Sequence, residues 1–188
     1  MGRCESSYML SVKELKNYAQ RLSAEEFLSQ LGPFALIQKP DELQDARHTE
    51  KMGLPHNMVV THMVAREKVS TAALSLLFQF ETLAVVTLPP LQGSDMLYIG
   101  RQPDCELVLD HPSVSKRHAL LRWNSAFGRS TLTDLESTNG TLLNASTRLR
   151  RETVLKDGDI VSFGEVQFWY LLTSTLYQKL AETPSAYI

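Results

Sequence analysis

The spacing of apolar residues near the start of the chain predicts α-helices. Apolar side chains recur at intervals of three and four residues from Leu15 to Leu22, which places them on one face of a helix. Ser11 and Glu14 form the Ser-x-x-Glu pattern of a capping box, so we expect this helix to begin after Ser11. A second such pattern, Ser23 to Glu26, predicts another helix start, and Gly32-Pro33 predicts its end.

The rest of the first 80 residues is less regular. Phe34 to Ile37 form an apolar run that is either a short strand or a buried connector. Asp41 to Met52 precede a glycine and are interpreted as a helix of poor periodicity, whereas Val69 to Phe80 carry the most regular helical stripe in the chain. We therefore expect about four helices within residues 1–80.

From Leu83 onward, short runs of strand-forming residues replace the helical pattern. Asp, Gly, Asn and Pro separate most of these runs, which predicts an antiparallel β-sandwich rather than alternating βαβ units. The segment Thr173 to Glu182 is weakly helical. We divide the chain into a helical region of unknown family (1–80), a β domain (81–175) and a C-terminal tail (176–188). The expected strands are Leu83–Leu88, Met96–Ile99, Glu106–Leu109, Ala119–Trp123, Ser130–Leu135, Thr141–Leu143, Asp159–Phe163 and Val166–Leu172.

Composition narrows the class of protein. The chain has 19 Lys and Arg against 21 Asp and Glu, a net charge of −2, which argues against nucleic-acid binding through bulk charge. No run approaches the roughly 20 apolar residues that span a bilayer, and no basic segment leads into an apolar one at the start. Cys4 and Cys105 cannot form a disulfide framework or a four-ligand zinc site. We expect a cytoplasmic protein that binds neither nucleic acid nor membrane.

Three polar clusters stand out in the β region, each in a predicted loop or at a strand end. They are Gly100-Arg101, then Ser113 to His118, then Asp134 to Thr141, with Asn144 shortly after. Together they supply a guanidinium, small hydroxyls, two further cations and an amide. These groups suit a dianionic phosphate held by charge-assisted hydrogen bonds, so they favour recognition over reaction.

The order of the motifs resembles a forkhead-associated (FHA) domain over roughly Thr82 to Thr173. The resemblance implies a β-sandwich of eleven strands whose loops at one end bind phosphothreonine peptides. Five blocks in the same order and spacing carry the resemblance, whereas any one of them alone is weak. The blocks are Gly100-Arg101, Ser115-x-x-His118, Ser137-Thr138-Asn139-Gly140-Thr141, Leu155-x-Asp157-Gly158-Asp159 and Phe163-Gly164.

The resemblance also implies a role for individual residues. Arg101 matches the arginine that reaches toward the phosphate, and Ser115 matches the serine whose hydroxyl donates to a phosphate oxygen, assisted by Lys116. Thr138 matches the hydroxyl residue of the second loop, and Asn139 the asparagine that holds the peptide backbone on both sides of the phosphorylated residue. Positions that shape the loops without touching ligand are Gly100, His118, Gly140 and Asn144.

The resemblance therefore implies a non-catalytic signalling adaptor without a metal or cofactor, whose partner is a protein phosphorylated on threonine by a Ser/Thr kinase. An alternative is a phosphate-independent scaffold that works through the helical stripe of Val69 to Phe80. An enzyme is a third class, but the spacing of Ser115 and His118 does not define a nucleophile and its base, and no oxyanion motif accompanies them.

Three further features have a structural and a functional interpretation. His48, His56 and His62 are spaced by eight and six residues, which fits no helical metal site. Arg148, Arg150 and Arg151 are interpreted as a solvated face, with an anion-attracting patch as the alternative. Met1 to Ser6 fit the Met-Gly-x-x-x-Ser pattern of N-myristoylation, with Cys4 placed for a second acyl chain.

Overall fold

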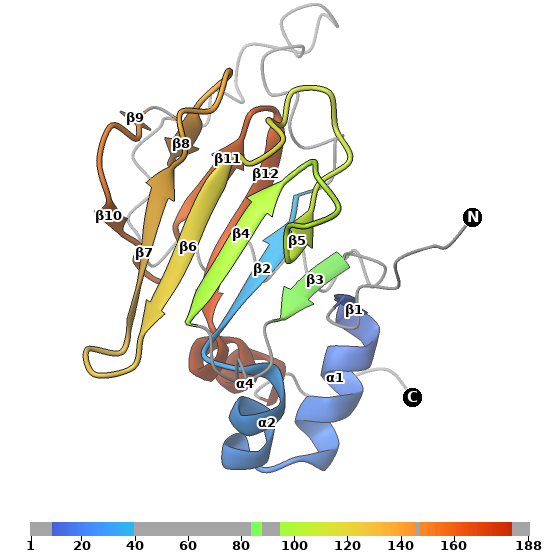
Figure 1. Ribbon diagram of the computed structural model, residues 1–188. Helices are drawn as coiled ribbons and strands as arrows, with labels where there is room; N and C mark the ends of the chain where they lie inside the picture. The colour runs from blue at the N-terminus through green and yellow to red at the C-terminus, as the bar shows by residue number, and fades with distance from the viewer. Residues whose placement is uncertain (1–8, 40–83, 88–94, 146, 182–188) are drawn as a thin grey trace, which may run out of the picture.

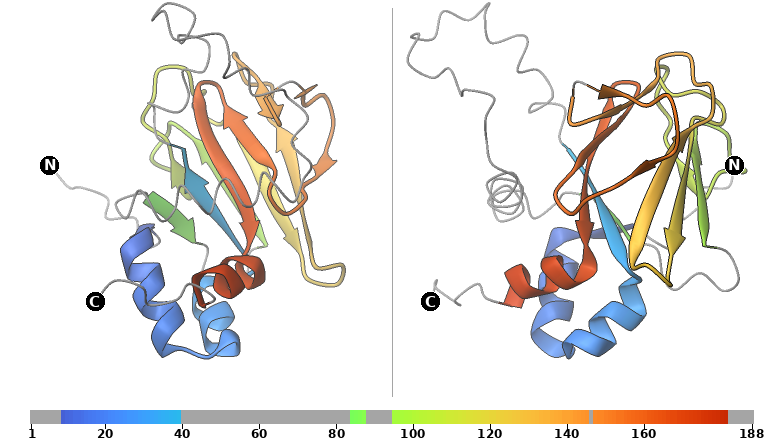
Figure 2. Two further views of the ribbon diagram at one scale, coloured as in Figure 1. Left: turned by 180° about the vertical axis from the view of Figure 1, so that it is seen from behind. Right: turned by 90° about the vertical axis from the view of Figure 1, so that its left-hand side faces the viewer.

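The computed structural model describes residues 9–39, 84–87, 95–145 and 147–181, which form two β-sheets and three helices (Figures 1 and 2). The fold is mainly β and mainly antiparallel, as the sequence pattern predicts. The two further helices expected at residues 41–52 and 69–80 lie outside the described residues, as does the N-terminal acylation pattern.

The first sheet has seven strands in the order β1-β3-β2-β12-β11-β8-β9. All of its pairings are antiparallel. The strands are β1 (Met9–Ser11), β2 (Phe34–Gln38), β3 (Ala84–Thr87), β8 (Thr141–Leu143), β9 (Thr147–Arg148), β11 (Ile160–Phe163) and β12 (Val166–Leu172).

The second sheet has five strands in the order β10-β7-β6-β4-β5 and packs face to face with the first (Figure 2). Its pairings are antiparallel except that β4 and β5 run parallel, with Ile99 opposite Leu107. The two-residue strands β9 and β10 were not expected, since segments of that length show no alternation. The strands are β4 (Met96–Gly100), β5 (Leu107–Val108), β6 (Ala119–Asn124), β7 (Arg129–Asp134) and β10 (Thr153–Val154).

The main core lies between the two sheets. Alternate residues of each strand point inward, so Leu97 and Ile99 of β4 are buried together with Phe168 and Tyr170 of β12. The buried Tyr170 hydroxyl donates to Ser130 Oγ at 2.9 Å, and burial raises the pKa of Tyr170 to about 12. The core therefore accommodates this polar group through a hydrogen bond.

The three helices pack against the other face of the seven-stranded sheet at β2, β3 and β12, near one end of the sandwich (Figure 2). They are α1 (Val12–Arg21), α2 (Ala24–Leu31) and α4 (Thr173–Ala181). The predicted capping boxes open α1 and α2, and Gly32 ends α2. None of the described helices is long and apolar enough to cross a membrane. This second core includes Val12, Leu15, Ala19, Phe27, Leu31, Ala35, Ile37, Val85, Trp169, Leu171, Leu176 and Leu180.

The packing does not divide the chain at residue 80, where the sequence pattern suggested a boundary. β2 lies inside the seven-stranded sheet between β3 and β12, with Leu36 opposite both Val86 and Tyr170. Because the helices cover one face of β2 and the second sheet covers the other, its side chains are apolar on both faces and show no alternation. Likewise, α4 contacts α1 and α2, so residues 173–181 belong to the helical layer rather than to a tail.

Candidate functional site

The three polar clusters lie at one end of the sandwich, and the helices lie at the other (Figure 1). The strand register explains this, because Ala119 at the start of β6 is opposite both Ile99 of β4 and Asp134 of β7. The segments that follow β4, precede β6 and follow β7 therefore emerge side by side. We call these segments, residues 100–102, 113–118 and 134–141, the rim.

Two backbone hydrogen bonds join the first segment of the rim to the second. The Arg101 N–H donates to the Ser115 carbonyl at 3.0 Å, and the Gln102 N–H donates to the Lys116 carbonyl at 3.1 Å. Gly100 makes this approach possible, because a Cβ at that position would overlap the Lys116 carbonyl oxygen. The glycine thus brings Arg101 beside Ser115.

The second and third segments meet at Ser115 and Thr138. The backbone N–H of Thr138 donates to Ser115 Oγ at 3.0 Å, and the two side-chain hydroxyl oxygens are 3.4 Å apart. Ser115 is partly exposed and Thr138 is exposed. Two small hydroxyls therefore stand together where solvent, or an anion, can reach them.

His118 lies fully buried beneath this pair and links the same two segments. Its Nδ1 accepts a hydrogen bond from the Ser115 N–H at 3.0 Å, so Nε2 carries the proton and donates to the Gly140 carbonyl at 3.2 Å. Burial lowers the pKa of His118, although the Gly140 carbonyl and the Asp134 charge partly oppose this. A neutral imidazole therefore links the second and third segments of the rim from below.

Asp134 shapes the turn that presents Thr138 and Asn139. Its carboxylate accepts hydrogen bonds from the Ser137 N–H at 3.1 Å, the Ser137 hydroxyl at 2.6 Å and the Thr141 hydroxyl at 2.6 Å. Burial alone would raise the pKa of Asp134, but these hydrogen bonds outweigh it and lower the pKa. The ionised carboxylate thus organises the turn from below.

Arg148 supports the same turn from β9, a role that the sequence analysis missed. Its Nη2 donates to the Ser137 carbonyl at 3.3 Å, and its Nε lies 2.5 Å from where a Cβ on Gly140 would stand. Gly140 has φ = 85°, which favours glycine. The chain between Thr141 and Arg148 forms the β8–β9 hairpin, and only that pairing brings the arginine to Ser137.

The cationic side chains at the rim differ in whether they have a partner. Within the part of the chain that the structure describes, the exposed side chains of Arg101 and Lys116 have no ion pair or hydrogen bond. Arg117 instead pairs with Asp104 at 2.7 Å, a contact that lowers the pKa of Asp104, and it lies 5.1 Å from the Tyr98 ring centroid. Arg101 and Lys116 are therefore the cations available to an anion here.

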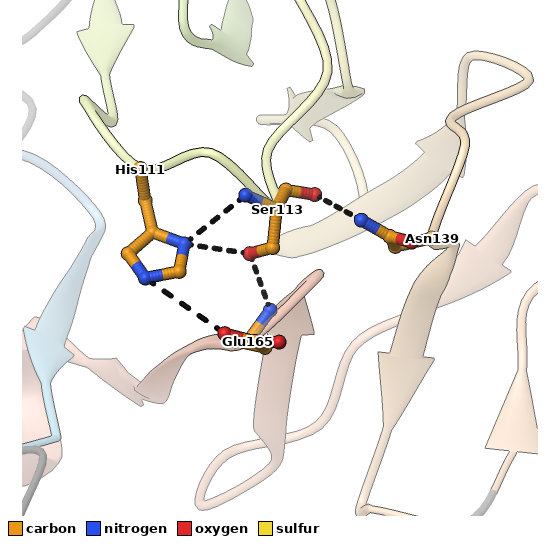
Figure 3. Close-up of polar contacts among 4 residues, drawn as sticks. All are labelled: His111, Ser113, Asn139 and Glu165. Carbon is orange, nitrogen blue, oxygen red and sulfur yellow. Dashed lines mark hydrogen bonds and ion pairs between the residues drawn. The ribbon is translucent and has the colours of Figure 1, made fainter.

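Asn139 is exposed and is held by the second segment. Its Nδ2 donates to the Ser113 carbonyl at 2.8 Å (Figure 3). Asn144, in contrast, holds the β8–β9 turn. It has φ = 52°, its amide nitrogen donates to Asp159 Oδ1 at 3.0 Å, and its amide oxygen accepts from the Ile160 N–H at 2.9 Å. These contacts of Asn144 stabilise a hairpin next to β8.

The structure thus brings together the backbone of Arg101, the hydroxyls of Ser115 and Thr138, the Lys116 backbone and the amide of Asn139. The sequence analysis gave no role to His111 or Glu165, which contact Ser113, the residue whose carbonyl accepts from Asn139 (Figure 3). Ser113 belongs to a cluster that the sequence singled out, but Glu165 is 52 residues away from it and carried no local signal.

The chain is similar to a known domain family and to several known proteins. The FHA domain family model matches residues 97–164. The oxoglutarate dehydrogenase inhibitor of Corynebacterium jeikeium is 32% identical over 108 residues, which cover 54% of this chain and 72% of the relative. The FHA domain-containing protein FhaA of Mycobacterium tuberculosis is 34% identical over 94 residues, 50% of this chain but 17% of that protein.

Two further matches are a relative aligned over a shorter segment and a solved structure. The FHA domain-containing protein PS1 of Arabidopsis thaliana is 43% identical over 47 residues, 25% of this chain and 3% of that protein. A solved structure from a study of phosphothreonine-dependent FHA domain interactions is 31% identical, with a TM-score of 0.40, and covers 46% of this chain and 82% of the other.

Proposed function

Since this chain belongs to the FHA-domain family, we propose that its rim binds a phosphothreonine side chain of a partner protein. Arg101 and Lys116 supply positive charge, Ser115 and Thr138 supply hydroxyls, and Asn139 holds the peptide backbone. The chain then acts as a non-catalytic adaptor, and its partner is a protein that a Ser/Thr kinase has phosphorylated.

The contact between Ser115 and Thr138 carries this proposal. It joins two hydroxyls from distant segments beside the backbone of Arg101, whose guanidinium has no ion pair among the described residues. A phosphothreonine brings a charge of about −1.5 to −2 at pH 7 and three acceptor oxygens. Hydroxyl donors and an unpaired guanidinium satisfy those oxygens with charge-assisted bonds, which are stronger than neutral ones.

Other features support recognition rather than catalysis. His118 is buried, and both of its ring nitrogens are engaged by backbone groups, so it is not placed to remove a proton from Ser115 Oγ. The helical stripe at residues 69–80, on which the phosphate-independent scaffold rests, lies outside the described residues. We therefore propose the phosphate-dependent module alone.

The test is a binding assay with an oriented phosphothreonine peptide library and the same library after dephosphorylation. Wild-type protein should select phosphorylated sequences with affinities of about micromolar order, because a peptide covers a small surface. Arg101→Ala should weaken binding by about 30-fold or more, since it leaves the phosphate without its main cation.

Arg129→Ala is the matched control, because Arg129 is exposed in the β6–β7 hairpin at the opposite end of the sandwich. Its affinity should equal that of wild type. Equal binding of both libraries would exclude a phosphate-dependent module. Equal affinity of wild type and Arg101→Ala would exclude the assigned role of Arg101.

A further inference from the structure

We propose that Ser113 is a positioning residue that orients the Asn139 amide toward the backbone of a bound peptide. This inference rests on the proposed function and adds to it a residue that the motifs did not assign. It comes from a network of four residues on one side of the rim, Ser113, His111, Glu165 and Asn139 (Figure 3).

The Asn139 amide has one fixed end and one free end. Nδ2 donates to the Ser113 carbonyl at 2.8 Å, and a carbonyl accepts only from a donor, so the orientation of the amide is determined. Oδ1 is then left as an acceptor, and Nδ2 keeps a second hydrogen. Because Asn139 is exposed, these two groups are available to a peptide N–H and a peptide C=O.

The hydroxyl of Ser113 holds its own backbone in place. Ser113 Oγ accepts a hydrogen bond from the Glu165 N–H at 2.9 Å and lies 2.7 Å from His111 Nδ1. The same Nδ1 accepts from the Ser113 N–H at 3.2 Å, so the ring nitrogen is the acceptor and the hydroxyl is the donor. The hydroxyl therefore connects Ser113 to His111 in the same segment and to Glu165 in the β11–β12 turn.

Gly164 shows how closely that turn approaches. A Cβ on Gly164 would lie 2.5 Å from the Ser113 carbonyl oxygen and 2.6 Å from Ser113 Oγ, and the residue has φ = 61°. The turn is thus packed directly against the carbonyl that Asn139 contacts. Three segments far apart in the sequence converge on Ser113.

The side-chain contact between His111 and Glu165 is secondary in this network. His111 Nε2 and Glu165 Oε2 are 3.9 Å apart, and their side chains are 39% and 79% exposed, so solvent screens the pair. The backbone N–H of Glu165 makes the shorter contact. That N–H also occupies a lone pair of Ser113 Oγ, which makes the hydroxyl a poorer nucleophile, so the network suits positioning better than catalysis.

Holding Asn139 before the peptide arrives reduces the conformational entropy lost on binding. Ser113→Ala keeps the carbonyl but removes the hydroxyl that fixes it. We expect this variant to weaken binding of a phosphothreonine peptide by about 3- to 10-fold, the cost of ordering a side chain at the interface. In an Asn139→Ala background, Ser113→Ala should alter the affinity less than about twofold. Ser113 acts through the Asn139 amide, so its substitution has little effect once that amide is absent.

The closing experiment is this double-mutant cycle, measured by calorimetry with one phosphothreonine peptide selected from the library. Ser125→Ala, in the β6–β7 hairpin at the other end, is the control and should bind as wild type does. An equal loss of affinity from Ser113→Ala in both backgrounds would overturn the proposal, because a general structural effect does not depend on Asn139.

A measurement on the free protein separates this inference from the proposed function. The ¹⁵N–¹H heteronuclear NOE of the Asn139 side-chain amide should fall in Ser113→Ala. The NOE should also fall in His111→Ala, because this variant removes the acceptor of the Ser113 hydroxyl. It should stay at the wild-type value in Glu165→Ala, because this variant keeps the backbone N–H that Ser113 Oγ accepts. An unchanged NOE in Ser113→Ala would overturn the positioning role. Failure of wild-type protein to bind any phosphopeptide would instead overturn the proposed function.

Discussion

The hydroxyl oxygen of Ser115 accepts a hydrogen bond from the backbone N–H of Thr138 at 3.0 Å, although the two residues are 23 positions apart. This contact joins the second and third segments of the rim at the surface, as His118 joins them below. The same hydroxyl donates to Thr138 Oγ1 at 3.4 Å, and in the proposed complex it would donate to a phosphate oxygen instead. Ser115 therefore has both a structural and a proposed binding role.

Ser115→Ala should weaken phosphothreonine peptide binding by about 10-fold or more, because a hydrogen bond to a charged group contributes roughly 1.5–3 kcal/mol. Calorimetric titration with the selected peptide measures this. Ser125→Ala is again the matched control. Wild-type affinity in Ser115→Ala would show that the hydroxyl donates nothing to the phosphate.

Gly100→Ala should lower the free energy of unfolding by roughly 1–3 kcal/mol, since the added methyl overlaps the Lys116 carbonyl oxygen and the two segments must move apart. Urea unfolding checks this. Gly128→Ala is an informative control because Gly128 has open space around its Cβ position but φ = 57°, so its cost comes from the backbone conformation alone. Unchanged stability of Gly100→Ala would contradict the close approach.

His118 should make stability depend on pH in a defined window. Its pKa is lowered in the folded protein by burial, so the unfolded chain takes up a proton first as the pH falls. The free energy of unfolding should therefore decrease as the pH falls through about 6.5, by at most about 1.4 kcal/mol per pH unit, until the lowered pKa is reached. Above this window His118 is neutral in both states.

Urea unfolding at a series of pH values from 8 to 5 measures this dependence. In His118→Gln the slope in this window should be smaller than in wild type. The contribution of Asp134 is separate, because its pKa is lowered and its stabilising effect is lost only below about pH 4. Equal slopes in wild type and His118→Gln would exclude His118 as the source.

A phosphoserine peptide should bind more weakly than the matching phosphothreonine peptide. Burying the extra methyl contributes on the order of 0.8 kcal/mol, about a fourfold difference in affinity. The β-branch also restricts χ1 before binding. Competition between the two peptides for wild-type protein tests this, and equal affinities would remove threonine selectivity from the proposal.

Much of the local structure follows from short-range rules that the sequence displays directly. The capping box of Ser11 and Glu14 forms because both partners lie within one turn of helix. The strands β4 and β12 lie in short runs rich in β-branched and aromatic residues. The resemblance of the motif order to an FHA domain also implied that these loops lie at one end of the sandwich.

Other features depended on contacts between distant segments. Phe34 to Gln38 could be read as a strand or a connector, because burial on both faces removes the alternation that identifies a strand. The boundary expected at residue 80 came from the change from helical to strand patterns there. It did not foresee that β2, which precedes residue 80, pairs with β3 and β12, which follow it. Arg148 looked like part of a solvated face, and only the β8–β9 pairing places it under Ser137.

The sequence by itself determined the identity of the chemical groups and the elements that carry them: an arginine after β4, a serine before β6, and a threonine and an asparagine after β7. These depend on residue type and on interactions over a few positions. The tertiary structure decided which groups touch. Strand register brings Ser115 to Thr138, and the β11–β12 turn reaches Ser113, because such pairings are set by the packing of the whole sandwich rather than by neighbours along the chain.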